Sequence, residues 1–443
     1  MTQTRRRFLK SAAAGVVAGT GIAGSRWPAA AAPRSANEQL NVAFIGVAGR
    51  GVRNLDALSP MVNVAALCDV DRQRLAAASA NHTSASTWTN FREMLSEQSD
   101  IDAVSISTPD HWHACIGIEA MRAGKHVYCE KPLARSIVEA RRMAEVAAEE
   151  GVVTQMGNQR HADERLRTVV EMVKAGVIGD VDEVHIWSGK GRSFSPGDRP
   201  QGSDPVPEWL DWNLWLGPSP ERPYVKDAYA HFDWRGWWDF GGGNLGDMGC
   251  HLFDCAYWAL DLDFPSKITT DGPAPHPEST PAGLACHYEF PARGDKPPVS
   301  IMWYDGTKAP PWKTIAGVKN MPPQGTLLIG KKGKILFPHN EPVELIVDGK
   351  SIGFDPPAQT IPRVDAVNPN HAEWVHAIRG EAKSLSNFAY AGRLTEVVLA
   401  GTVAHRAGQS IDWDGPNMRA TNCPAADKFI KPTFRQPWAQ TLS

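Results

Sequence analysis

The chain has 443 residues and carries 46 lysines and arginines against 49 aspartates and glutamates, a formal net charge of −3. This length allows two domains, each with its own core, and an acidic balance without a basic stripe argues against a nucleic-acid-binding protein. The seven cysteines are scattered without the spacing of a zinc site, so we expect no bound metal and interpret them as buried apolar side chains.

Residues 1–34 have the three regions of an export leader. Three consecutive arginines at 5–7 are followed by Phe-Leu-Lys, an Ala/Gly-rich run over 12–23 and four alanines at 29–32. This pattern is typical of a twin-arginine signal peptide, because a membrane anchor needs about 20 strongly apolar residues. We therefore expect the twin-arginine export machinery to carry the folded protein to the periplasm or otherwise out of the cytoplasm. The leader's six basic residues leave the remaining chain with a formal charge of −9.

A strand, a turn, a helix and a second strand are predicted next. Residues 41–45 and 62–68 are short apolar runs typical of buried parallel strands, and residues 52–58 are predicted as a helix. This order of elements is that of a mononucleotide-binding unit, whose ligand lies at the carboxyl ends of the strands.

The turn over residues 46–51 reads Gly-Val-Ala-Gly-Arg-Gly, and Asp69 follows the second strand 18 residues after Gly51. Glycines let the backbone approach a pyrophosphate, the helix N-terminus faces its charge, and the acid can bind a ribose. Ala48 replaces the usual second glycine, although Gly49 follows directly. The pattern predicts a dinucleotide site, with a purely structural turn as the alternative.

Asp69 also bears on which dinucleotide is bound. Its carboxylate would repel a 2′-phosphate, so NAD is favoured over NADP. Arg50 and Arg72 would weaken that repulsion.

Helices and strands continue to alternate, which predicts a doubly wound parallel sheet over residues 38–157. Thr108, Pro109 and His113 follow one predicted strand, and Glu130-Lys131-Pro132 follows the next. Both groups therefore lie at the carboxyl ends of strands, where such sheets bind ligands. The further helices are predicted at 72–81, 114–123 and 138–150, and the further strands at 103–107, 126–129 and 152–156.

These two motifs, together with Gly-Gly-Gly-Asn-Leu-Gly-Asp-Met-Gly-Cys-His-Leu-Phe-Asp at 241–254, resemble the Gfo/Idh/MocA family of oxidoreductases. The resemblance implies a Rossmann domain at 38–157 and an α+β domain at 158–443 with a large open, mainly antiparallel sheet. Many members associate through that sheet, so we expect a homodimer or homotetramer. The resemblance also implies a catalytic set of Lys131, Asp247 and His251.

The chemistry of these residue types agrees with that set. A histidine has a pKa suited to removing a hydroxyl proton, although a single histidine is otherwise more often a satisfied buried residue. Asp247 and His251 share one helix face at i and i+4, and Lys131 can stabilise the charge developing on the reacting oxygen. We expect tightly bound NAD, with NADP less favoured. The predicted cofactor contacts are Gly46, Ala48, Gly49, Arg50, Gly51, Asp69, Thr108, Pro109, His113, Glu130, Lys131 and Asn158.

Tryptophans and tyrosines gather between 209 and 238, and such rings suit the C–H faces of a carbohydrate. Trp209, Trp212 and Trp215 have helical spacing, which favours core packing. The predicted substrate contacts are Arg160, Trp237 and Trp238. His111 and Trp112 either line the pocket or pack against the cofactor.

The second half is predicted to hold strands at 285–290, 299–303, 326–329 and 334–337, helices at 371–379 and 390–404, and a surface tail from 412. The sequence as a whole predicts an exported oxidoreductase that transfers hydride between a sugar, polyol or glycoside hydroxyl and bound NAD. Two alternatives stay open: a redox-neutral glycosidase or lyase acting through a transient keto sugar, and a binding protein that has lost catalysis.

Overall fold

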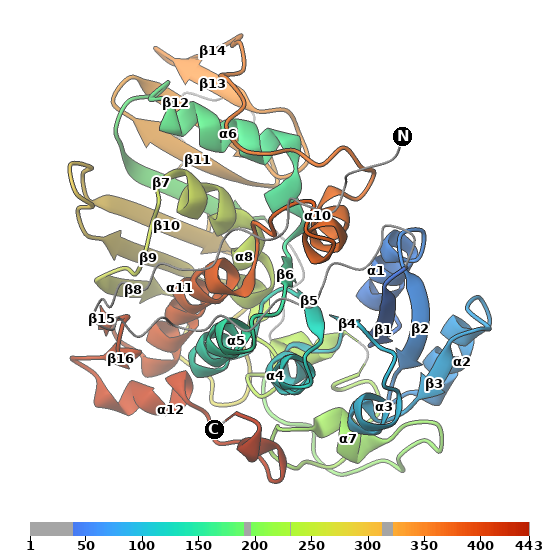
Figure 1. The fold of residues 1–443 in the computed structure, drawn as a ribbon. Coiled ribbons are helices and arrows are strands. Elements are labelled where there is room, and N and C mark those ends of the chain that lie inside the picture. Colours follow the sequence, from blue (N-terminus) through green and yellow to red (C-terminus); the bar gives the residue numbers. More distant parts are fainter. Residues whose placement is uncertain (1–38, 190–195, 231, 312–321, 443) are drawn as a thin grey trace, which may run out of the picture. The chain divides into compact units, whose positions relative to one another are not determined.

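The computed structural model describes residues 39–189, 196–230, 232–311 and 322–442, so the predicted leader lies outside the described residues. Six strands form an all-parallel sheet in the order β3-β2-β1-β4-β5-β6 (Figure 1). The strand order reverses between β1 and β4, which is where a doubly wound sheet opens a crevice for a ligand. The strands are β1 (Asn41–Ile45), β2 (Asn63–Cys68), β3 (Ser86–Trp88), β4 (Ala103–Ile106), β5 (His126–Glu130) and β6 (Thr154–Gly157).

Helices cover both faces of this sheet, which explains why its inner strands β1, β2, β4 and β5 are buried along most of their length. Along β1, Val42 and Phe44 pack into one buried cluster, whereas Ala43 and Ile45 pack into another. The predicted parallel sheet is therefore confirmed. Its helices are α1 (Arg50–Leu58), α2 (Arg72–Ser79), α3 (Phe91–Glu97), α4 (His113–Arg122) and α5 (Ile137–Glu150).

The second sheet has ten strands in the order β14-β13-β12-β11-β7-β10-β9-β8-β15-β16. Strands β7 and β10 pair in parallel, and the other pairs are antiparallel, as the sequence predicted. The strands are β7 (Val181–Ser188), β8 (Lys267–Asp271), β9 (Ala285–Phe290), β10 (Val299–Asp305), β11 (Gln324–Gly330), β12 (Gly333–Pro338), β13 (Glu344–Val347), β14 (Lys350–Ile352), β15 (Ile411–Asp414) and β16 (Arg419–Ala420).

The tail is more structured than predicted, because β15 extends this sheet beside β8 and Trp438 is buried against Phe91 and Trp112. Helix α8 (Gly243–Ala259) packs on β7 and β11, beside α6 (Glu164–Lys174). The short helices α7 (Trp212–Leu216) and α12 (Asp427–Ile430) lie outside both sheets.

Two late helices return to the parallel sheet (Figure 1). Helix α10 (Pro369–Ile378) packs against α1, and α11 (Phe388–Ala407) packs against α5, β6 and α8. The core of the first sheet is thus completed by residues more than 200 positions later in the chain.

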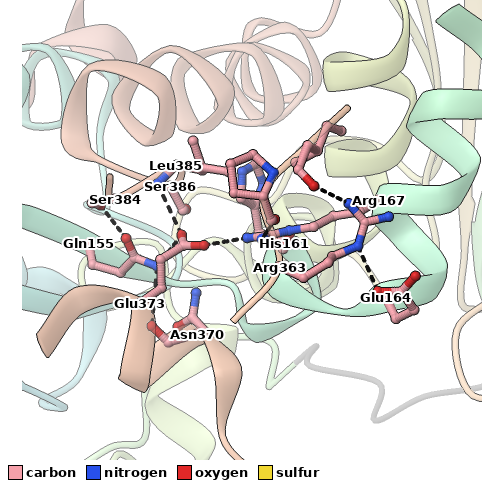
Figure 2. Close-up of polar contacts among 12 residues, drawn as sticks. Gln155, His161, Glu164, Arg167, Arg363, Asn370, Glu373, Ser384, Leu385 and Ser386 are labelled. Atoms are coloured by element: carbon pink, nitrogen blue, oxygen red, sulfur yellow. Dashed lines mark hydrogen bonds and ion pairs between the residues drawn. The ribbon is translucent and has the colours of Figure 1, made fainter. Parts of the chain in front are cut away.

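A buried polar network joins α6, α10 and β6 (Figure 2). Arg167 of α6 forms an ion pair with Glu373 of α10, and both side chains are almost fully buried. Glu373 also accepts hydrogen bonds from Gln155 Nε2 (3.3 Å) and the Leu385 amide (3.0 Å). Because each buried charge depends on the other, this network fixes α6 against α10.

All seven cysteines lie in the described ranges and are buried without disulfides, in agreement with their interpretation as apolar side chains. Over the same ranges, no helix is long and apolar enough to cross a membrane. These ranges also hold no group of three or more metal-ligating side chains suited to an ion.

Candidate functional site

A cavity of about 810 Å³ runs along the carboxyl edge of the parallel sheet. It is lined by the turn after β1, by the residues that follow β2, β4 and β5, by parts of segment 209–235 and by α8. The cavity therefore joins the predicted dinucleotide turn to the predicted catalytic residues.

The glycine turn has the geometry that a pyrophosphate needs. Gly46 has φ 81°, and a Cβ there would lie 2.7 Å from the Ser107 carbonyl carbon. A Cβ on Gly51 would lie 1.9 Å from the Gly46 oxygen, so Gly51 serves close packing and does not line the cavity. Among the described residues no side chain caps α1, and the cavity reaches its first residue, Arg50, and the neighbouring Ala48 and Gly49. This open helix terminus and its glycines fit an anionic phosphate group.

Asp69, which was predicted to contact the cofactor, lines the cavity at the end of β2. Its carboxylate accepts hydrogen bonds from the amides of Val47 and Asp71, both at 3.0 Å. Burial raises the pKa of Asp69 above its ordinary value, against these two hydrogen bonds and the charge of Arg74. Asp69 therefore shapes the turn and also presents its carboxylate to the cavity.

Lys131, Asp247 and His251 meet at the other end of the cavity. Lys131 Nζ lies 2.5 Å from Asp247 Oδ1 and donates a second hydrogen bond to the Asp247 carbonyl (3.0 Å). His251 lies one turn later on α8 and lines the cavity. Burial, and then the charge of Lys131, hold the pKa of His251 well below its usual value, so the imidazole is neutral at pH 7. His251 Nδ1 is buried without a hydrogen-bond partner among the described residues.

Arg235 and Asp110 complete this charged group and were missed from the sequence. Arg235 Nη1 lies 3.1 and 3.2 Å from the two carboxylate oxygens of Asp110 and 3.3 Å from Asp247 Oδ1. Burial alone would raise the pKa of Asp247, but Arg235 and Lys131 hold it well below its usual range. One signal for this contact was present in the sequence. Arg235 lies between Trp234 and Trp237, which indicates burial, and a buried guanidinium requires a carboxylate partner.

Glu130 was predicted to contact the cofactor, and it lies at the cavity edge with little exposure. Its Oε1 accepts hydrogen bonds from Arg50 Nε, Asn54 Nδ2 and Gln159 Nε2, each at 2.9 Å. Burial opposes ionisation, but the charges of Arg50 and Lys131 keep the pKa of Glu130 lowered. Glu130 thus orients Arg50 at the phosphate end of the cavity.

Thr108, Pro109 and His113, which were predicted to contact the cofactor, line the cavity. The His113 ring nitrogens lie 2.8 Å from the Pro132 carbonyl and 3.0 Å from the Thr108 carbonyl, so this ring braces the backbone after Lys131. Asn158 does not line the cavity that the described residues form. It lies behind α8, fully buried, and its Nδ2 donates to Asp254 Oδ2 at 3.0 Å.

The predicted placement of Trp237 and Trp238 in the pocket is wrong, because neither lines the cavity as the described residues define it. Both are buried, and their Nε1 atoms donate to the backbone carbonyls of Ala228 and His276, each at 3.0 Å. Arg160 also lies outside the cavity lining and pairs with Asp163.

Other aromatic side chains of the same segment do line the cavity. Trp209 and Trp215, predicted as core, both line the cavity, as does Trp234. Trp212 and Trp215 of α7 are also buried in an aromatic cluster, in agreement with their helical spacing, whereas Trp209 precedes α7 and is only partly buried. Trp112 also lines the cavity, whereas His111 is fully buried against Trp215.

Two models of a single family match this chain. The oxidoreductase family NAD-binding Rossmann fold matches residues 40–158, and the C-terminal alpha/beta domain of the same family matches residues 163–291. The chain belongs to the Gfo/Idh/MocA family. The two matched domains agree with the presence of two sheets in the structure, and the NAD-binding fold of the family agrees with the glycine turn after β1.

Curated relatives of this Gfo/Idh/MocA protein include a glycosyl hydrolase family 109 protein of Shewanella putrefaciens, 32% identical over 204 residues. A second protein of that name, from Shewanella sp. strain MR-4, is 33% identical over 156 residues. The first match covers 40% of this chain and 44% of the relative, and the second covers 32% and 34%. The chain thus matches less than half the length of these relatives.

Solved structures share the fold of this Gfo/Idh/MocA chain over most of its length. The WlbA dehydrogenase of Bordetella pertussis, in complex with NADH and UDP-GlcNAcA, has a TM-score of 0.60 at 17% identity, covering 85% of this chain and 99% of that one. A levoglucosan dehydrogenase in complex with NADH and levoglucosan has a TM-score of 0.60 at 18% identity, with the same coverage. The aldose-aldose oxidoreductase of Caulobacter crescentus has a TM-score of 0.59 at 17% identity, covering 85% and 100%.

Proposed function

We propose that this chain is an exported NAD-dependent oxidoreductase that transfers hydride between a sugar, polyol or glycoside hydroxyl and a tightly bound nicotinamide. The observation that carries the proposal is one cavity that joins the glycine turn and Asp69 to Lys131, Asp247 and His251. A site with a dinucleotide turn at one end and a charge-balanced lysine and a neutral histidine at the other suits oxidation of an alcohol.

The residues at the first end of the cavity fit NAD. Gly46, Ala48 and Gly49, with the N-terminus of α1, would hold the pyrophosphate, and Asp69 would hold the adenosine ribose. When bound there, NAD supplies the hydride acceptor. The Asp69 carboxylate favours a free ribose hydroxyl over a 2′-phosphate.

The residues at the reacting end handle the proton and the oxygen. His251 is neutral and would accept the hydroxyl proton as a general base. Lys131, held by Asp247, would donate a hydrogen bond to the same oxygen and stabilise its developing negative charge. Asp247 stays ionised between Lys131 and Arg235, and Asp110 pairs with Arg235, so two carboxylates balance the two cations that orient the site.

A carbohydrate is the proposed substrate class. The cavity is lined by Trp112, Trp209, Trp215 and Trp234, whose rings suit C–H faces. The names of the levoglucosan dehydrogenase and aldose-aldose oxidoreductase neighbours support the same class. We also propose that the chain forms a homo-oligomer through its large open sheet.

The leader supports export by the twin-arginine pathway with the cofactor already bound. Free NAD is scarce outside the cytoplasm, so the cofactor would stay bound while one substrate reduces it and a second reoxidises it. Such a cycle gives ping-pong kinetics, with parallel double-reciprocal lines for pairs of sugars.

The first experiment is to purify the protein without added nucleotide, denature it and identify what is released by absorbance and mass. Stoichiometric NAD would support the proposal. An empty protein that binds NADH weakly, or one that needs added NAD for turnover, would contradict it. Titration of the stripped protein with NADH and NADPH tests the preference for NAD.

A redox-neutral glycosidase is the second candidate, because the curated relatives are named glycosyl hydrolase family 109 proteins. In this reaction a hydroxyl is oxidised transiently, the neighbouring bond is broken, and the hydride returns. Release of p-nitrophenol from p-nitrophenyl glycosides without a second sugar would favour this candidate. Accumulation of a keto sugar would favour the oxidoreductase.

A further inference from the structure

Residues 209–216, which we call the retaining wall, follow the six strands of the parallel sheet in the chain and lie at the adenosine end of the cavity. The Arg72 amide donates to the Trp209 carbonyl (2.9 Å), and the Asp211 amide donates to the Val70 carbonyl (3.1 Å). Asp71 and Leu210 form an antiparallel bridge between these two bonds. The wall is therefore joined by its backbone to the loop that directly follows Asp69.

The other end of the retaining wall is joined to the loop after β4. Trp112 Nε1 donates to the carbonyls of Leu214 (3.0 Å) and Trp215 (3.1 Å). His111 Nε2 lies 2.9 Å from the same Trp215 carbonyl. The wall thus joins the loop after β2 to the loop after β4. It crosses β1, which lies between these two strands in the sheet and carries the glycine turn.

The side chains of the retaining wall face the same cavity as Asp69. Trp209, Leu210, Leu214 and Trp215 all line it. Trp212 stacks behind Trp215, with ring centroids 4.7 Å apart and planes 14° apart, so the wall is backed by rigid aromatic packing. A surface already held in place encloses a ligand without an ordering cost on binding.

We propose that the retaining wall encloses the adenosine half of the cofactor and slows its dissociation. This inference rests on the proposed function, in which NAD occupies the cavity. Release of the adenosine would require the contacts between the wall and residues 70–72 to open, so those contacts set the dissociation rate. The wall thereby supplies the retention that an enzyme working away from free NAD needs.

Arg72 allows one of these contacts to be removed selectively. Arg72 is the first residue of α2, a position where proline is tolerated because its missing N–H has no partner within the helix. Asp71 before it has φ −100° and ψ 104°, a conformation that proline accepts in its preceding residue. Arg72→Pro therefore removes the hydrogen bond to Trp209, whereas Arg72→Ala removes the exposed side chain and keeps that bond.

The experiment measures exchange of NADH from the full mature chain. Protein loaded with isotope-labelled NADH is mixed with excess unlabelled NADH and desalted at intervals, and the bound label is measured by mass. Loss of one hydrogen bond should speed release about fivefold in Arg72→Pro, while Arg72→Ala stays within about twofold of wild type. Equal rates for the two variants would overturn the assigned role of the backbone contact.

Trp209→Ala tests the side chain of the wall. Release should become at least about tenfold faster, because a large part of the enclosing surface is lost. The matched control is Trp258→Ala, a half-buried tryptophan of α8 that lies outside the cavity lining. A wild-type rate in Trp209→Ala, with far-ultraviolet circular dichroism unchanged, would overturn the wall and leave the proposed function intact. A wild-type chain that holds no NADH would instead overturn the proposed function.

Discussion

The reacting end and the adenosine end of the cavity are held by different kinds of interaction. At the reacting end, two cations and two carboxylates lie in contact, namely Lys131, Arg235, Asp110 and Asp247. At the adenosine end, backbone amides and carbonyls hold an aromatic wall in place. Removing one charge leaves its neighbour uncompensated, whereas removing one ring only reduces contact area. Substitutions at the reacting end should therefore reduce function strongly, whereas substitutions at the adenosine end should reduce it less.

The largest effect is expected from His251→Ala at the reacting end. Loss of the general base should lower kcat by about 10²–10⁴-fold and leave the amount of bound NAD unchanged. Single-turnover reduction of the nicotinamide, followed by absorbance, measures this step. The control is His376→Ala, a half-buried histidine of α10 that lies outside the cavity lining. Unchanged turnover would remove His251 from the mechanism.

Arg235→Met should produce the largest loss of stability. The variant leaves Asp110 buried without its cation, at a cost of about 3–5 kcal/mol in the free energy of unfolding. Adding Asp110→Asn should restore at least about half of that loss. Arg142→Met, which breaks exposed ion pairs on α5, should cost about 0–1 kcal/mol. Urea unfolding of the stripped protein gives all of these values, and an additive double variant would argue against the coupling.

His111 lies beneath the retaining wall and should make stability depend on pH. Burial lowers its pKa to about 3, whereas an unfolded chain has a value of about 6.5. Between these values only the unfolded chain binds the proton, so the His111 contribution is complete above about pH 6.5 and is lost as pH falls.

Replacement by Phe should therefore reduce the slope of unfolding free energy against pH by up to about 1.4 kcal/mol per unit between about pH 6 and 4. The Trp215 carbonyl keeps its bond from Trp112 in this variant. An identical slope in His111→Phe and wild type would show that the buried ring is not the titrating group.

The smallest effect is expected at Asp69. Asp69→Asn keeps an oxygen that can accept from the Val47 amide but removes the negative charge, so NADPH affinity should rise about tenfold relative to NADH. Fluorescence titration of the stripped protein with each nucleotide measures the ratio. Should the ratio stay as in wild type, cofactor choice would depend on other residues.

The sequence predicted the parts of the site that lie on regular local patterns. Gly46 and Asp69 follow strands with clear apolar runs, and Asp247 and His251 share a helix face through their spacing. Arg235 and Asp110 were missed because their partnership joins residues 125 positions apart, and no periodicity records such a contact.

The error in the tryptophan segment has a related cause. Trp237 and Trp238 were placed in the pocket because they precede the glycine block, but the position of an aromatic ring in an irregular segment depends on which carbonyl its N–H reaches. Trp237 donates to the Ala228 carbonyl and does not line the cavity as the described residues define it. Trp209 lines the cavity because of backbone pairing with Arg72, which the sequence does not encode locally.

Helices α10 and α11 limit how early the fold of the parallel sheet can be completed while the chain is being synthesised. A ribosome releases the six parallel strands first, but the faces that α10 and α11 cover stay open until residues 369–407 have been synthesised. The retaining wall also emerges about 140 residues after the strand-end loop that it joins. The parallel sheet therefore cannot complete its core until nearly the whole chain has left the ribosome. Enclosure of a nucleotide must wait until the retaining wall, residues 209–216, has emerged.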